Sequence, residues 1–293
     1  MTDQQWLAER FEEHRPRLRA VAYRMLGSLT EADDAVQDAW LRASRAGAGG
    51  VENLAGWLTT IVARVALNML RSRGARRQQP LDVHLPDPVI DPPGGTDPEH
   101  EALLADSVGL ALLVVLEALG PAERLAFVLH DMFAVPFDEI AEIVDRSPEA
   151  TRQLASRARQ RVRGSVTVPD ADLDVQWRVV DVFLTAARSG DFEALIAVLD
   201  PDVVLRADGG IGLSHYVQGA AEVARQASMW RRTGLSVRRA LVNGAAGLVS
   251  ERDGKPFSVG AFTIRNGKIV ECDFLVDPAR VAQLDLRALD ERP

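Results

Sequence analysis

The stretch FDEIAEIVDRSPEATRQLASRARQRVR (Phe137–Arg163) decides the fold of the middle of this chain. Apolar residues recur at helical spacing over 137–144 and again after Pro148. Between these two runs, Ser147 is suited to cap the second helix and Pro148 to occupy its first position. Two helices joined by a turn of about three residues form a helix-turn-helix, which is the fold that this stretch predicts.

The second helix of this unit is strongly basic, with five Arg and no acidic residue between Ala150 and Arg163. A recognition helix reads bases with its N-terminal residues and touches phosphates further along. Base contacts therefore fall to Arg152, Gln153 and Ser156, and mainly phosphate contacts to Arg157, Arg159 and Arg161. A solvated basic face with no partner is the alternative interpretation.

Upstream, residues 1–77 show helical periodicity, interrupted at Gly27 and at the glycine-rich loop Gly47–Gly50. Thr30 is the expected N-cap of the helix after Gly27, with Asp33 three residues later as a variant of the capping box. A third helix is expected to begin near Asn53.

The helix after Gly27 carries more acid than its own end requires. Asp33 complements the helix dipole, but Asp38 follows Asp34 by four residues. Such like-charge pairs cost an isolated helix about 0.2–0.5 kcal/mol. A basic partner surface would turn this cost into affinity, whereas a solvated face would leave it unused. Both interpretations stay open.

Residues 54–77 combine an apolar stripe with five Arg and no acid. One helix end needs fewer cations than the four that lie between Arg71 and Arg77. Phosphate binding, with Trp57 available to stack on an unpaired base, is the sharper interpretation. A Trp57 buried in the core is the simpler one.

The next segment, 78–106, holds six Pro and seven acidic residues but no Lys or Arg, which is typical of a linker. Net charge over the 293 residues is −8, so the two basic stripes stand out against an acidic chain. The single cysteine, Cys272, excludes a disulfide framework and a multi-cysteine metal site. We expect a cytoplasmic protein without a signal peptide or membrane segment.

The last part of the chain changes character. Two helices, Val175–Ser189 and Phe192–Leu199, precede short β-like runs, and Asp253-Gly254 and Asn266-Gly267 are preferred hairpin dipeptides. We expect an α+β domain with a mostly antiparallel sheet. The strand-like runs are Val203–Ala207, Leu235–Val242, Gly247–Glu251, Phe257–Arg265 and Lys268–Val276. The expected division of the chain is a helical domain at 1–77, a linker at 78–106, a helix-turn-helix domain at 107–164, a second linker at 165–175 and an α+β domain at 176–293.

Three segments together carry a family resemblance. AYRMLGSLTEADDAVQDAWLRA, GWLTTIVARVALNMLRSRGARR and DEIAEIVDRSPEATRQLASRARQRVR resemble regions two and four of extracytoplasmic-function sigma factors of the sigma-70 family. The later segment VFLTAARSGDFEALIAVLDPDVVLRADGG resembles a cone-shaped SnoaL-like domain. The combination is similar to the SigJ-type subgroup. It implies two all-α sigma domains followed by an α+β SnoaL-like domain.

The resemblance implies partners and sites. Asp33, Asp34, Gln37 and Asp38 would dock on core RNA polymerase, and the helix-turn-helix would read the minus-thirty-five element of promoter DNA. The melted minus-ten strand would contact Trp57, Arg64, Asn68, Arg71, Arg73, Arg76 and Arg77. No catalysis, cofactor or metal is expected.

Three short motifs would regulate the contact between domains by the same resemblance. They are Leu85-Pro86-Asp87-Pro88, Asp208-Gly209-Gly210 and Asp277-Pro278 with Arg280. Whether the C-terminal domain binds a small molecule stays open; His215, Tyr216, Asp208 and Asp273 are candidates to line a cone cavity. Two other functions are considered: a ligand-sensing helix-turn-helix regulator, and a SnoaL-type enzyme with a DNA-binding appendage.

Overall fold

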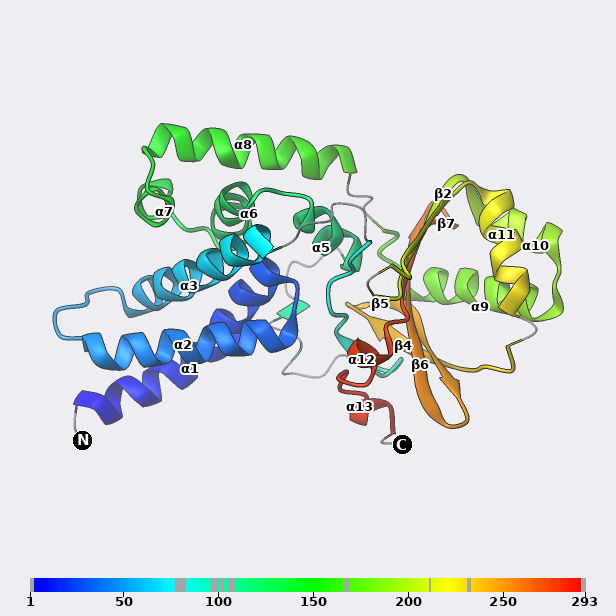
Figure 1. Ribbon diagram of the computed structural model, residues 1–293, viewed down its shortest axis with the longest axis horizontal. Coiled ribbons are helices and arrows are strands. Elements are labelled where there is room, and N and C mark those ends of the chain that lie inside the picture. Colours follow the sequence, from blue (N-terminus) through cyan, green and yellow to red (C-terminus); the bar gives the residue numbers. More distant parts are fainter. Residues whose placement is uncertain are drawn as a thin grey trace. The chain divides into compact units, whose positions relative to one another are not determined.

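The computed structural model describes residues 3–76, 83–95, 100, 103–104, 109–165, 169–210, 212–230 and 233–290 (Figure 1). The chain forms two compact units. The first comprises 1–78, 98–106 and 112–166, and the second comprises 79–97, 107–111 and 167–293. Much of the expected linker therefore belongs to the same unit as the C-terminal domain.

The first unit opens with three helices, α1 (Asp3–Leu26), α2 (Leu29–Ala46) and α3 (Leu54–Arg76), each in contact with the other two. They bury a shared apolar core in which Phe11, Tyr23 and Leu58 are fully enclosed. The third helix begins as expected, because the Asn53 side chain accepts a hydrogen bond from the Gly56 N–H at 3.0 Å.

The expected cap of α2 is wrong by two residues. Ser28, not Thr30, is the N-cap, and its hydroxyl accepts from the Glu31 N–H at 3.4 Å. Ser28 and Glu31 have the spacing of a capping box, so the motif lies two residues earlier than expected. Thr30 lies inside the helix.

Helix α5 (Gly109–Glu117) starts in the second unit, and its residues from 112 onward belong to the first. The first unit continues with α6 (Pro121–Phe127), η1 (Val128–Met132), α7 (Phe137–Val144) and α8 (Pro148–Ser165). The turn between α7 and α8 is confirmed, with Asp145 in the left-handed conformation at φ 58°. One continuous helix was expected over 123–132. Instead its second half, η1, is π-helical.

The second unit is built on one seven-stranded sheet of order β1-β4-β5-β6-β7-β2-β3. Only β2 and β7 pair in parallel; the other described neighbours are antiparallel. The strands are β1 (Ile90–Asp91), β2 (Leu199–Asp208), β3 (His215–Gln218), β4 (Ser236–Val242), β5 (Ala245–Arg252), β6 (Lys255–Arg265) and β7 (Lys268–Leu275).

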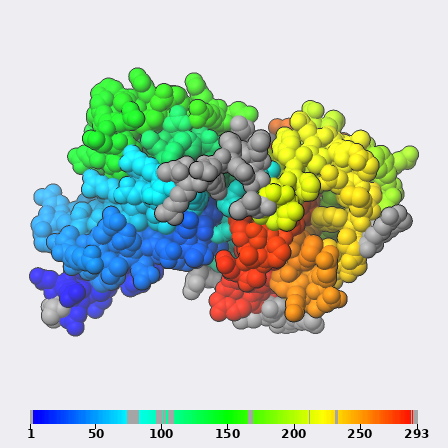
Figure 2. All heavy atoms as spheres, in the orientation of Figure 1, coloured from blue at the N-terminus to red at the C-terminus, as the bar shows by residue number. Residues whose placement is uncertain are grey.

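Helices α9 (Leu173–Ser189), α10 (Phe192–Val198) and α11 (Ala220–Met229) cover one face of the sheet (Figure 1). Two short helices, α12 (Pro278–Val281) and α13 (Arg287–Asp290), follow the last strand. Figure 2 shows them in red beside the orange strand β6, which α12 contacts. The expected fold class, two helical parts and an α+β domain, is confirmed.

Both hairpin dipeptides are confirmed. Asp253-Gly254 has φ values of 53° and 73°, and Asn266-Gly267 has 54° and 71°, as a type I′ turn requires. A third turn of this kind, Asn243-Gly244, joins β4 to β5 with φ values of 51° and 78°.

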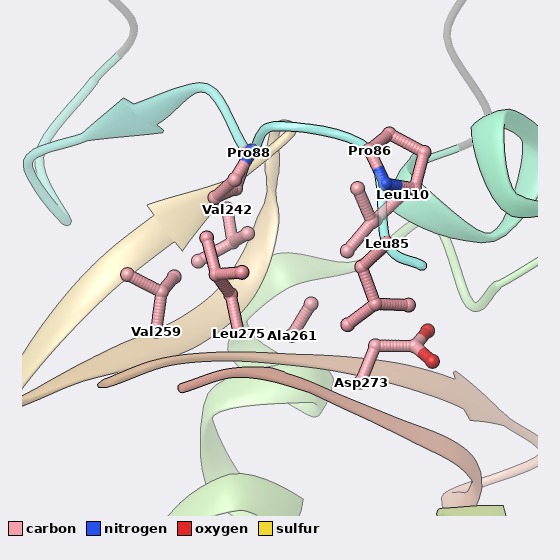
Figure 3. A pocket seen from close by; sticks show the side chains of 9 residues that line it. All are labelled: Leu85, Pro86, Pro88, Leu110, Val242, Val259, Ala261, Asp273 and Leu275. Carbon is pink, nitrogen blue, oxygen red and sulfur yellow. The ribbon is translucent and has the colours of Figure 1, made fainter. Parts of the chain in front are cut away.

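Strand β7 shows how the two faces of the sheet differ. Cys272 and Phe274 belong to the apolar core with the helices, so Asp273 and Leu275 point to the opposite face. That opposite face carries residues 85–88 of the expected linker (Figure 3). The linker segment thus contributes buried Leu85 and Ile90 and an edge strand, β1, which its Pro-rich composition did not indicate.

Candidate functional site

The recognition helix α8 is positioned by its buried side. Ser147 caps it by accepting from the Ala150 N–H at 3.2 Å. Leu154, Ala155 and Ala158 are buried, which turns the residues between them outward. The candidate base-reading residues Arg152, Gln153 and Ser156 are all exposed near the start of the helix.

The later Arg residues of α8 have acidic partners inside the same unit. Arg157 and Arg161 both reach Glu123 of α6, at 3.3 and 2.5 Å, and Arg159 lies 2.7 Å from Asp131 of η1. These pairs are largely solvent-exposed on the Arg side, where an ion pair contributes at most about 1 kcal/mol. DNA phosphates can therefore compete for these guanidinium groups.

The candidate minus-ten residues of α3 fall into two groups. Trp57, Arg64, Asn68 and Arg71 lie at intervals of seven, four and three residues, which places them on one face of the helix. Arg64, Asn68 and Arg71 are exposed, and Trp57 is half-buried.

Arg73 points elsewhere, because it donates to the Leu26 carbonyl at 3.0 Å and pairs with Glu31. It therefore holds α3 to the junction of α1 and α2. Arg77 lies outside the described residues, as does the side chain of Arg76.

The acidic face of α2 is less uniform than its sequence suggests. Asp33 pairs with Arg19 at 2.6 Å, and Asp38 pairs with Arg42 of the same helix at 2.8 Å. Arg42 therefore offsets the repulsion between Asp34 and Asp38, which removes the physical argument that this repulsion demands a partner. Asp34 and Gln37 are exposed.

Arg124 of α6 joins the two helical parts of the first unit. Its side chain is 3% exposed and donates to the Met25 carbonyl at the end of α1 at 2.8 Å. The same Nη1 also lies 2.9 Å from Glu117 Oε1. A second contact is made by Phe133, whose ring lies under Arg17 and Arg24 of α1 at 5.8 and 5.1 Å.

In the second unit, residues 83–91, hereafter the clamped segment, are held by two charged side chains. The Leu85 N–H donates to Asp208 Oδ2 at 2.9 Å, and Arg280 Nη2 donates to the Leu85 carbonyl at 2.6 Å. Arg280 also reaches Asp87 Oδ1 at 2.5 Å and Asp208 Oδ2 at 2.6 Å. We call Asp208 and Arg280 the clamp. The three motifs named for regulation thus meet in one place.

The glycines of the second motif allow this close approach. A Cβ on Gly209 would stand 2.6 Å from the Leu213 carbonyl oxygen, and one on Gly210 would stand 2.7 Å from Asp277 Oδ2. Gly210 also has φ +87°, which side-chain-bearing residues avoid. Asp277 caps α12, with Pro278 as its first residue, and so presents Arg280 to the clamped segment.

The sheet face beneath the clamped segment is apolar around one charged cluster. Figure 3 shows Leu85 pointing toward Ala261 and Asp273, with Val259 and Leu275 beside Pro88. Asp273 lies 2.7 Å from Arg206, which also contacts Glu271 at 3.1 Å. Burial raises the pKa of both carboxyl groups despite the nearby guanidinium.

Of the residues considered for a cone cavity, Asp208 and Asp273 therefore serve other contacts. His215 and Tyr216 are exposed on β3. In the part of the chain that the structure describes, no three His, Cys, Asp or Glu side chains gather as a metal site would need. Nor does any described helix combine the length and apolar character needed to cross a bilayer.

The environment of Asp208 shifts the pKa of its carboxyl group strongly. Burial alone would raise its pKa, but hydrogen bonds from His84, the Leu85 N–H and the Gly210 N–H, with the charge of Arg280, lower it to about 2. Because folding lowers this pKa from 3.8 to about 2, the ionised Asp208 carboxylate stabilises the folded domain above about pH 4. This stabilisation is lost as the pH falls to 2, where the carboxylate becomes protonated.

We therefore expect the C-terminal domain to lose about 2 kcal/mol through Asp208 between pH 4 and pH 2. Urea unfolding at a series of pH values gives the unfolding free energy of the native chain and of Asp208→Asn. The loss is the difference between the slopes of these two free energies against pH. Glu271 and Asp273, whose pKa values are also shifted, are present in both chains, so their contributions cancel. Parallel slopes would show that Asp208 is not stabilised in its charged form.

Two family models match this chain. Sigma-70 region 2 covers residues 10–76, and Sigma-70, region 4 covers residues 109–162. The probable ECF RNA polymerase sigma factor SigI of Mycobacterium tuberculosis (strain CDC 1551 / Oshkosh) is 34% identical over 276 residues, or 92% of this chain and 93% of SigI. The chain belongs to the ECF family of RNA polymerase sigma factors.

A second relative supports the assignment across the domains. ECF sigma factor SigJ of M. tuberculosis H37Rv is 42% identical over 199 residues, which is 68% of this chain and 64% of the length of SigJ. The crystal structure of M. tuberculosis SigJ superposes with a TM-score of 0.76 at 33% identity, covering 95% of this chain and 99% of that one. The SigJ-type resemblance is thereby confirmed.

In sigma-factor terms, α1–α3 form region two and α5–α8 form region four. The alternative of a plain helix-turn-helix regulator is not favoured, because it does not account for region two. The relatives named here are sigma factors and not enzymes.

Three residues that contact the functional residues of this sigma factor were not predicted from the sequence. Arg42 had a signal in the sequence, since it follows Asp38 by four residues. Asn243 was visible as half of an Asn-Gly hairpin turn, but its contact with Val89 was not. Arg124 gave no signal, because its role comes from a contact with a carbonyl 99 residues away.

Proposed function

We propose that this sigma factor binds core RNA polymerase through α2, engages the minus-ten strand through α3 and the minus-thirty-five duplex through α8. Its C-terminal domain modulates that activity by holding the clamped segment. The observation that carries the proposal is the set of exposed surfaces on matched regions: acids on α2, a Trp–Arg–Asn stripe on α3 and a basic helix start on α8. Transcription from defined promoters with reconstituted core polymerase tests it.

The polymerase contact rests on Asp34, which is exposed on α2. Asp34→Arg should lower affinity for core polymerase at least about tenfold, because it reverses a charge that faces a basic partner. Glu9→Arg is the matched control, since it makes the same charge change at an exposed position of α1. Binding is measured by fluorescence titration against core polymerase. An equal loss of affinity in both variants would show that only the net charge of the chain matters, and not a contact at Asp34.

The minus-thirty-five contact divides α8 by position. Arg152→Ala should cost roughly 1–3 kcal/mol at one or two base pairs and relax the preference there, as a base contact does. Arg159→Ala should weaken binding evenly across sequences and flatten the salt dependence, because phosphate binding releases counterions. Binding to a set of single-base-pair promoter variants at two salt concentrations separates the two. Identical profiles for both variants would contradict the base-reading role of Arg152.

The minus-ten contact is supported by the α3 stripe of Trp57, Arg64, Asn68 and Arg71. Arg side chains at this spacing can follow a strand backbone while the indole stacks on an unpaired base. Arg73 is less suited to this role, since it bonds Leu26 and Glu31 within region two.

The regulatory role is supported by the clamp. The linker between regions two and four must reach between the polymerase-bound regions, whereas in the free chain its residues 85–88 lie on the sheet of the C-terminal domain. The linker cannot be bound to the C-terminal domain and extended on polymerase at the same time. By holding the linker, the C-terminal domain therefore opposes polymerase binding. No small molecule is required for this competition.

A further inference from the structure

The clamped segment is bound in the manner of a peptide ligand. It adds the short strand β1 to the free edge of β4, with Ile90 opposite Val242 and Asp91 opposite Leu241. The Asn243 N–H donates to the Val89 carbonyl at 2.8 Å, and the Val89 N–H donates to Asn243 Oδ1 at 3.2 Å. This is strand addition at a sheet edge, a common mode of peptide recognition.

Side-chain recognition accompanies these backbone bonds. Leu85 is 1% exposed and points toward Ala261 and Asp273, on an apolar sheet face that also carries Val259 and Leu275 (Figure 3). Two residues later, Asp87 meets the guanidinium of Arg280. The site thus selects a leucine and an acidic residue at a fixed spacing.

The clamp is held by the C-terminal domain itself. Asp208 Oδ1 accepts from the Gly210 N–H at 3.1 Å, and the Asp208 carbonyl accepts from the Val276 and Asp277 N–H groups at 2.8 and 3.0 Å. These bonds fix Asp208 without any help from the clamped segment. The adjacent Ser214 hydroxyl donates to the Val83 carbonyl at 3.0 Å and extends the site by one contact.

We propose that this sheet face is a peptide-binding site of which the clamped segment is the resident occupant. In trans it takes an extended segment of a partner protein that carries Leu-Pro-acid-Pro followed by two strand-forming residues. None of the contacts depends on the covalent link between site and segment, so the same sequence in another chain meets the same partners. The acid is required because it supplies Arg280 Nη2 with a carboxylate acceptor, while Asp208 accepts from Nη1 of the same guanidinium. This inference rests on the proposed regulatory role of the clamp and names the partner that would operate it.

A labelled peptide of sequence VHLPDPVID, residues 83–91, tests the site on the full-length chain by fluorescence anisotropy. The native chain should bind it weakly, because a tethered competitor acts at an effective concentration in the millimolar range. Leu85→Asp weakens that competitor and should lower the Kd of the peptide at least about tenfold. Asp87→Arg is a second release variant, which repels Arg280 and leaves the apolar residues intact.

Two controls establish specificity. Adding Arg280→Ala to either release variant should remove the gain, and the peptide VHDPDPVID should not bind. Equal affinity for the native and release variants, or binding that survives both controls, would overturn the proposal. So would concentration-dependent dimers of the native chain that the peptide fails to dissociate, because the occupant would then be a second copy.

The same peptide separates this inference from the proposed function. Added to transcription reactions, it should change output from the native chain and leave the release variants unaffected. Peptide binding without any change in transcription would keep the site and remove its regulatory role. Transcription that depends on the clamp without peptide binding would keep the regulatory role and overturn the exchangeable site.

Discussion

Arg280→Ala is expected to release the linker from the C-terminal domain. The Arg280 guanidinium contacts Asp208, Asp87 and the Leu85 carbonyl, so its removal takes away the cation that the two carboxylates share. Asp208 is 3% exposed, whereas Arg280 and Asp87 are 19% and 18% exposed. The loss therefore lies between that of a buried and a surface ion pair, at about 2–3 kcal/mol.

Amide hydrogen exchange measures this release at the residues concerned. The Leu85 and Val89 N–H groups donate to Asp208 and Asn243 of the C-terminal domain, so both lose their acceptors when the segment is released. Their protection from exchange should therefore fall by about 30- to 150-fold in Arg280→Ala. Amides inside β5 and β6 should keep theirs. Arg287→Ala is the control, since its exposed side chain bonds Asp285 and lies outside the clamp. Unchanged protection of Val89 would show that the strand contact holds the segment without Arg280.

The local elements of the fold were predictable because each has its signal in adjacent residues. The Ser147-Pro148 start of α8 and the Asn266-Gly267 turn were both found from sequence alone. Strand β1 was not, because a two-residue strand flanked by prolines has no periodicity. Its stability comes from pairing with the edge of β4, more than 140 residues away in sequence.

The functional sites were likewise predictable only where adjacent residues carry the signal. The motif residues Asp208, Arg280 and Asp87 were assigned to one function by resemblance, but only the fold shows that they share hydrogen bonds. The like-charge argument for Asp34 and Asp38 was also misleading, because Asp38 has an Arg partner on α2 itself and the neighbouring Asp33 has one on α1. Charge counting treats such residues as free.

The buried contact of Arg124 should have the largest effect on the helical unit. Arg124→Ala removes one partner of a buried pair and leaves Glu117, which is 13% exposed, without its cation. Breaking such a pair costs about 3–5 kcal/mol. The Met25 carbonyl loses its donor as well, so the end of α1 and the start of α6 should both open more easily.

Hydrogen exchange in α1 and α6 of the full-length chain measures that loss without interference from the C-terminal domain. Arg161→Ala is the matched control: it also removes a region-four guanidinium paired with a Glu, but Arg161 is 55% exposed and should cost at most about 1 kcal/mol. The double variant Arg124→Met with Glu117→Leu should recover most of the stability, because buried ion pairs are often replaceable by apolar groups. A double variant as unstable as Arg124→Ala would assign the effect to the Met25 carbonyl alone.

The same variants bear on how the sigma factor opens. The names of the two promoter elements place them about 25 base pairs apart, which is about 85 Å at 3.4 Å per base pair. Regions two and four pack together through Arg124 and through the contacts of α3 with α6 and α7. We expect that regions packed in this way do not span such a distance, so the contact should break on the promoter. Arg124→Ala should lower the energy of that step. We expect it to bind a two-element promoter on core polymerase more tightly relative to a minus-thirty-five element alone, whereas Arg161→Ala should leave that ratio unchanged. An unchanged ratio in Arg124→Ala would mean that polymerase binding separates the two regions without resistance from this contact.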